Sequence, residues 1–204
     1  MKLSTKIVAI AILIIALIGG VYYWSLERKL NKRFSENLYE NTTFPSSYIN
    51  QKYGIKLNYP SDWQLIQGDS SNEIVAKLIP KSGKLDSSSN EVIIASQLLD
   101  KSMSLDEYTT ENVYKITKTS GQAKILDSQV ITLNNNQAHQ VIYTAQEDNK
   151  NLKYWQTWLL KNNRAYTITY KAKENSYDNF IKPVQETIVK SFEVEKVEPK
   201  TQPQ

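Results

Sequence analysis

The segment Tyr53–Tyr59 alternates apolar and polar residues, and this pattern restricts the fold more strongly than any other feature of the chain. Its apolar members are Tyr53, Ile55, Leu57 and Tyr59. A period of two is typical of a half-buried β-strand, with one face toward a core and one toward water. Pro60 cannot donate to a strand ladder, so the strand ends there and the chain re-enters the fold at Trp63. The sequence therefore predicts a domain built on a sheet.

A run of 20 uncharged, mostly apolar residues, Ile7–Leu26, precedes this domain. At about 1.5 Å per residue a helix of this length spans roughly 30 Å, which is the hydrocarbon thickness of a bilayer. A cleaved signal peptide is the alternative, because Lys2 and Lys6 precede an apolar stretch of suitable length. Since Ile18-Gly19-Gly20 is a poor cleavage site, we expect an uncleaved signal anchor, a single transmembrane helix.

Aromatic and basic side chains cluster at the end of this run, as is usual at a membrane interface. The expected interface residues are Tyr22, Tyr23, Trp24, Arg28, Lys29, Lys32 and Arg33. Beyond them, Leu26, Leu30, Phe34 and Leu38 are four apart, which predicts an amphipathic stalk that a polar linker follows. Basic residues on both sides of the run leave the orientation open by the positive-inside rule. The very short N-terminal tail favours a domain outside the cytoplasm.

Composition excludes several kinds of site. The chain has no cysteine, which rules out a disulfide framework, a thiolate metal site and a cysteine nucleophile. The formal net charge is +4, but residues 1–40 contain six basic and three acidic side chains and so carry +3 of it. The remainder is close to neutral, which disfavours the clustered basic face that nucleic-acid binding needs.

The rest of the chain has the pattern of an antiparallel sheet. Strands are expected at residues 73–79, 91–98, 123–133, 137–146, 152–160 and 164–171. Short turns rich in Asn and Asp separate the last four, which predicts a meander of hairpins. Ser104 with Glu107 forms a capping box that opens a helix to about Thr119. A second, short helix is expected from Ser176, with a kink or restart at Pro183.

The third strand of the meander is apolar on both faces. Tyr154 and Trp158 share one face, whereas Trp155 and Leu159 share the other. Because both faces must be covered, we expect an α+β domain with an antiparallel sheet and helices on both sides. The expected core residues are Tyr59, Trp63, Trp158, Tyr166 and Phe180. The expected divisions are a basic tail (1–6), the anchor (7–26), stalk and linker (27–47), the domain (48–194) and a disordered tail (195–204).

Several of these features together resemble the PsbP family. They are a strand closed by Tyr59-Pro60 with Trp63 three residues later, the hairpins after Ala123, and the closing segment Ile188–Phe192. The best-known member of that family is an extrinsic subunit of the photosystem II oxygen-evolving complex. The resemblance covers 48–194 and implies an α/β/α sandwich in a cyanobacterial periplasm or thylakoid lumen. Calcium is a cofactor expectation from the resemblance alone. The retained anchor departs from the plant subunit, which is soluble.

The sequence shows no grouping of residues that indicates catalysis. His139 is the only histidine, nothing near it resembles a nucleophile elbow, and no phosphate loop or EF-hand loop occurs. We therefore assign no catalytic or cofactor-binding residues, and no metal ligands can be named. The expected protein is not an enzyme but a binding or assembly module with membrane lipid and a protein complex as partners, accessory to photosynthesis or to another envelope complex. A small-ligand carrier or hydrolase-like enzyme with a pocket between sheet and helices is the alternative.

Overall fold

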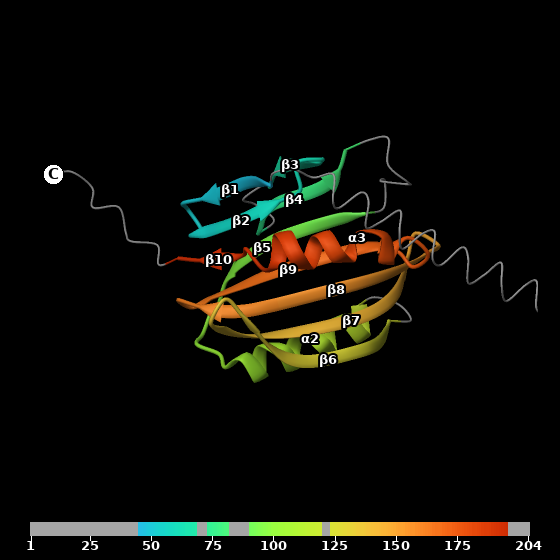
Figure 1. Cartoon of the computed structure of the whole chain (residues 1–204). Helices are drawn as coiled ribbons and strands as arrows, with labels where there is room; N and C mark the ends of the chain where they lie inside the picture. The colour runs from blue at the N-terminus through green and yellow to red at the C-terminus, as the bar shows by residue number, and fades with distance from the viewer. Residues whose placement is uncertain (1–44, 69–72, 82–89, 120–122, 196–204) are drawn as a thin grey trace, which may run out of the picture. The chain divides into compact units, whose positions relative to one another are not determined.

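The strands of the computed structural model form two antiparallel sheets (Figure 1). The structure describes residues 45–68, 73–81, 90–119 and 123–195, all within the unit Thr42–Gln204. The small sheet has the order β1-β2-β10, with β1 at Ser46–Asn50, β2 at Ile55–Tyr59 and β10 at Glu193–Val194. The large sheet has the order β3-β4-β5-β9-β8-β7-β6. Its strands are β3 (Trp63–Gln67), β4 (Ile74–Pro80), β5 (Glu91–Leu98), β6 (Lys124–Leu133), β7 (Asn136–Glu147), β8 (Lys150–Lys161) and β9 (Arg164–Lys173).

Pro60 marks the passage of the chain from the small sheet to the large one. The Trp63 amide donates to the Pro60 carbonyl at 2.9 Å, which closes a tight turn between β2 and β3. One sheet was predicted, and the split into two is a correction. It arises because a residue without an N–H group ends the first ladder, and the turn then directs β3 against β4 instead of β2.

Three hairpins connect β6, β7, β8 and β9, as the turn residues predict. Both central residues of each turn have positive φ, with Asn134 at 44° and Asn135 at 64° in the first. Asp148-Asn149 and Asn162-Asn163 repeat this geometry. It is the geometry of the type I′ turn, whose twist matches that of paired strands and which Asn and Asp tolerate well. The meander prediction is therefore confirmed.

The helix α2 (Leu105–Thr119) starts at the predicted capping box. The Ser104 Oγ atom accepts from the Glu107 amide at 3.2 Å, and the Glu107 carboxylate accepts from the Ser104 amide at 2.8 Å. The helix α3 (Tyr177–Pro183) ends at its proline, and the π-helical segment η3 (Val184–Val189) follows directly. The expected restart at Pro183 is thus observed.

Two apolar clusters lie against the large sheet. The larger contains Trp155, Leu159 and Phe180, together with residues of the small sheet and η3. The smaller contains Trp158 with Tyr108 and Ile116 of α2. Trp155 and Trp158 of β8 therefore belong to different clusters, as the alternation predicts. The mixed α and β class with mainly antiparallel sheets is confirmed, whereas the full sandwich with helices covering both faces stays a prediction.

Some elements and boundaries differ from the sequence-based expectation. The strands β1, β3 and β10 were not predicted, because each has at most five residues and lacks a clean alternation. Ser46 and Ser47, expected in the linker, belong to β1. Tyr53 was expected in the strand but lies in the turn before β2, where Gly54 has a positive φ of 65°.

The expected membrane anchor and stalk, 7–44, lie outside the described residues, as does 196–204 of the expected tail. No helix within 45–68, 73–81, 90–119 or 123–195 is long and apolar enough to cross a membrane.

Candidate functional site

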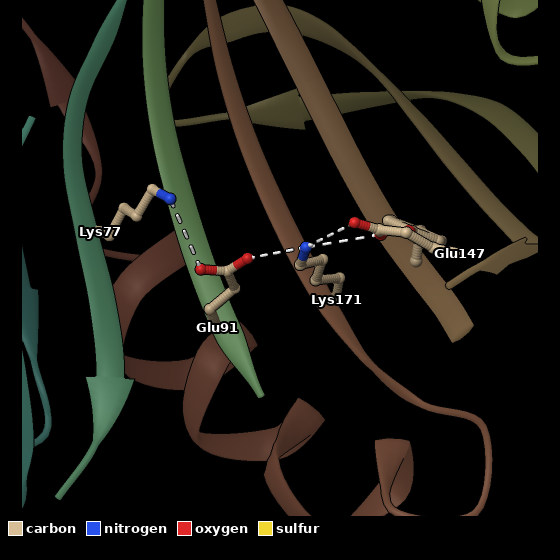
Figure 2. A network of polar contacts seen from close by, with 5 residues as sticks. Lys77, Glu91, Glu147 and Lys171 are labelled. Atoms are coloured by element: carbon tan, nitrogen blue, oxygen red, sulfur yellow. Dashed lines mark hydrogen bonds and ion pairs between the residues drawn. The ribbon is translucent and has the colours of Figure 1, made fainter. Parts of the chain in front are cut away.

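Four charged side chains form a continuous row across the large sheet (Figure 2). Lys77 of β4, Glu91 of β5, Lys171 of β9 and Glu147 of β7 make up this charged row. The Lys171 Nζ atom lies 2.9 Å from Glu91 Oε1 and 3.5 Å from Glu147 Oε1, and the Lys77 Nζ atom lies 3.9 Å from Glu91 Oε2. Glu91 and Lys171 are directly paired in register, so the sheet places their side chains on the same face.

Tyr154 of β8 extends the charged row at its Glu147 end. Its hydroxyl donates to Glu147 Oε2 at 2.7 Å, and its ring stacks on that of Tyr143 with centroids 4.6 Å apart. This hydrogen bond and the nearby Lys171 ammonium lower the pKa of the Glu147 carboxyl. Burial raises the pKa of Tyr143 to about 12, and burial together with the bond to Glu147 raises the pKa of Tyr154. Both phenols therefore stay protonated at neutral pH.

The centre of the charged row is more enclosed than its ends. The side chains of Glu91 and Lys171 are 19% and 22% exposed, compared with 38% for Lys77 and 48% for Glu147. Burial opposes the charge of Lys171, but its bonds to Glu91 and Glu147 outweigh burial and raise its pKa. Two cations and two carboxylates leave the row neutral and internally paired. Such a surface can exchange hydrogen bonds with a partner, but it offers no activated nucleophile.

A shallow hollow of about 480 Å³ lies near the Glu147 end of the charged row. Its lining comes from the start of β8 and the residues that end β9, namely Lys150, Asn151, Lys173, Glu174 and Asn175. The Glu174 amide donates to the Asn151 carbonyl at 3.1 Å, which holds the two segments together. Ammonium and amide groups of this kind can bind a small polar molecule.

His139 lies at the meeting point of β6, β7 and β8. Its Nε2 atom is 2.8 Å from Ser128 Oγ, and its ring stacks on Trp158 at a centroid distance of 5.6 Å. Burial lowers the pKa of the imidazole, while Asp106 and Asp127 oppose that effect. Among the described residues no carboxylate hydrogen bond to the other ring nitrogen is present, so the pair lacks the third member of a catalytic triad.

Within the described ranges, no group of three or more His, Asp or Glu side chains is arranged to hold a metal ion. The expected interface residues, from Tyr22 to Arg33, lie outside those ranges. Of the expected core residues, Trp63, Trp158, Tyr166 and Phe180 are buried, and Tyr59 is partly buried against the larger cluster. Sequence reasoning did not find the charged row. Single charges inside otherwise apolar strands, such as Lys77 in β4, were the available signal.

The family model described as "PsbP-like protein" matches residues 5–194. No curated protein matches the sequence. Many solved structures are similar in fold, and three of them are described here. Cyanobacterial PsbP (CyanoP) of Synechocystis sp. PCC 6803 has a TM-score of 0.58 at 15% identity, covering 74% of this chain and 92% of its own. LpqN of Mycobacterium tuberculosis, described as involved in cell envelope biogenesis, has a TM-score of 0.57 at 13% identity, covering 75% and 91%.

The third is the Ran-binding protein Mog1p of Saccharomyces cerevisiae, with a TM-score of 0.51 at 12% identity, covering 74% of this chain and 95% of its own. Identities this low show a shared fold and do not indicate what this chain binds.

Proposed function

Because the chain belongs to the family of PsbP-like proteins, we propose that it is a non-catalytic binding or assembly module anchored in a membrane by Ile7–Leu26. Its domain lies outside the cytoplasm, in a periplasm or thylakoid lumen, as an α/β/α sandwich. Its partner is a membrane protein complex, either a photosynthetic one such as photosystem II or another complex of the cell envelope.

The observation that carries this proposal is the extent of the family match. The matched range, 5–194, runs without interruption through the apolar segment and the whole described domain. Because the family model includes both parts, it favours an apolar segment that stays attached to the domain and anchors it. Arg28, Lys29, Lys32 and Arg33 would then meet lipid phosphates beside Tyr22, Tyr23 and Trp24.

The chemistry of the described surface supports binding over catalysis. Ionic groups of the charged row are satisfied by one another, and both nearby tyrosines remain protonated donors. The photosynthetic alternative follows from the family resemblance, and the structural neighbours at 13% to 15% identity add the shared fold alone.

A small-ligand carrier is the second candidate, and the hollow between β8 and the end of β9 is the observation that favours it. A carrier would retain a small polar molecule when the protein is purified, whereas an assembly module would retain a protein. Mass spectrometry of the purified chain under native and denaturing conditions distinguishes these outcomes.

Co-purification from the organism's own membranes tests the main proposal. The tagged full chain, solubilised in mild detergent, should bring a membrane complex with it in stoichiometric amount. A matched chain that keeps residues 1–47 and carries an unrelated domain should not do so. Recovery of the full chain alone after crosslinking in intact membranes would rule out the assembly role.

A further inference from the structure

Three neighbouring strands of the large sheet bring an apolar and two cationic side chains together at one end. Leu98 of β5 pairs in register with Arg164 of β9, which pairs with Lys161 of β8. Paired residues share a face, so the three side chains lie in a line on the face that carries the larger apolar cluster. Leu98 is 62% exposed, which is unusual for a leucine that ends a central strand.

The turn between β1 and β2 adds two more residues at the same place. The Tyr53 ring lies under the Arg164 guanidinium at 5.4 Å and under the Lys52 ammonium at 5.0 Å. The Tyr166 hydroxyl donates to the Tyr53 carbonyl at 3.1 Å and fixes the turn against the large sheet. In Figure 1 this turn and the β8–β9 turn lie on the left. We call Leu98, Arg164, Lys161, Lys52 and Tyr53 the distal patch.

The cations of the distal patch are not neutralised inside the fold. Among the described residues, no carboxylate lies within ion-pair distance of Lys52, Lys161 or Arg164. Among the described residues, the Lys161 ammonium donates to the Val194 carbonyl at 2.7 Å, and one guanidinium nitrogen of Arg164 is buried without a hydrogen-bond partner, which leaves the rest of that group to face a partner. The charged row, by contrast, is fully paired.

We propose that the distal patch binds an acidic segment of a partner protein, with carboxylates on the cations and an apolar side chain against Leu98. The arginine held over the tyrosine ring combines two residue types that are enriched at interface hot spots. Three cations that have no ion-pair partner among the described residues are complementary to carboxylates, which form strong charge-assisted hydrogen bonds with them.

The distal patch lies at the end of the described domain opposite to the start of β1. Ser46, where β1 begins, pairs with Tyr59 at the end of the small sheet remote from the Tyr53 turn. The chain thus enters the domain at one end, and the distal patch lies at the other.

This inference rests on the proposed binding role and names the surface and the chemistry that serve it. The test uses the full chain in phosphatidylcholine nanodiscs and a fluorescent peptide in which glutamates surround a leucine. The same peptide with glutamine at every glutamate position is the reference probe. Fluorescence anisotropy should show binding of the acidic peptide alone, and added salt should weaken it.

Variants locate the binding. Arg164→Glu and Lys52→Glu should each lower the affinity for the acidic peptide by about tenfold or more, because charge-assisted hydrogen bonds are lost. Lys124→Glu, an exposed lysine at the start of β6, is the matched control and should leave binding unchanged. Lys52 is exposed and lies over the Tyr53 ring, so Lys52→Glu keeps the test valid if Arg164→Glu fails to fold.

Three results would overturn the assignment. They are equal binding of both peptides, an equal loss in Lys124→Glu and Lys52→Glu, and displacement of the peptide by phosphatidylglycerol vesicles, which would identify lipid as the ligand. Failure of co-purification from native membranes would instead remove the assembly role, whatever the peptide shows.

Discussion

Trp158 connects α2 to the large sheet. It is 1% exposed, its indole nitrogen donates to Thr109 Oγ1 at 2.9 Å, and its ring lies edge-on to Tyr108 and stacked on His139. We predict that Trp158→Ala costs about 3 to 5 kcal/mol of unfolding free energy, because the lost burial leaves a cavity beneath α2. Urea unfolding of the full chain in detergent measures it.

Leu126→Ala is the matched control, because Leu126 is 47% exposed on the edge strand β6 and its loss should cost little. A Trp158→Ala protein that melts within about a degree of the parent and loses partner binding would identify Trp158 as a contact residue.

His139 makes stability depend on pH. Burial lowers the pKa of its imidazole below the ordinary value of about 6.5. The unfolded chain therefore binds a proton more readily, so the contribution of His139 is fully present above about pH 6.5 and is lost as pH falls through the folded-state value. We predict a decline in unfolding free energy between about pH 7 and about pH 5.

His139→Gln isolates this effect, since glutamine can still bond to Ser128 but does not titrate. Urea unfolding at several pH values should give a flatter profile for the variant in that range. An identical slope in both proteins would show that His139 does not cause the decline.

At the scale of elements, the three type I′ turns fix the register of the meander. Asn135 has φ of 64°, and no side-chain hydrogen bond from it is present among the described residues, so its backbone conformation can be tested in isolation. We predict that Asn135→Ala costs about 1 to 2 kcal/mol, because alanine tolerates the left-handed region poorly. Asn135→Gly should be neutral or stabilising.

Thermal unfolding of the two variants measures the difference. Gln137→Ala, in the adjoining strand, controls for loss of a polar side chain without a change of backbone preference. If alanine and glycine at position 135 behave alike, the turn does not require positive φ in solution.

At the scale of the whole molecule, we predict that the apolar segment stays in the mature protein and that the domain lies outside the cytoplasm. The segment is long enough to span a bilayer and is poorly suited to cleavage. N-terminal sequencing should not begin near Val21. Protease added to right-side-out vesicles should remove the domain, and full protection of the domain in such vesicles would reverse the orientation.

The local elements were readable from the sequence because their causes are local. Capping at Ser104, the Asn and Asp turns of the meander, the end of β2 at Pro60 and the opposite faces of Trp155 and Trp158 each depend on a few neighbouring residues. Those features predicted an antiparallel α+β domain, and two of them, the end of β2 at Pro60 and the hairpins, also contributed to the family resemblance.

Tertiary structure alone decided which strands share a sheet and which side chains meet. β10 pairs with β2 although most of the sequence separates the two strands. Lys171 meets Glu91 only because β9 inserts beside β5. The distal patch joins Tyr53 to Arg164 in the same way. Such contacts depend on register between distant segments, and a one-residue shift would turn each of these side chains to the other face.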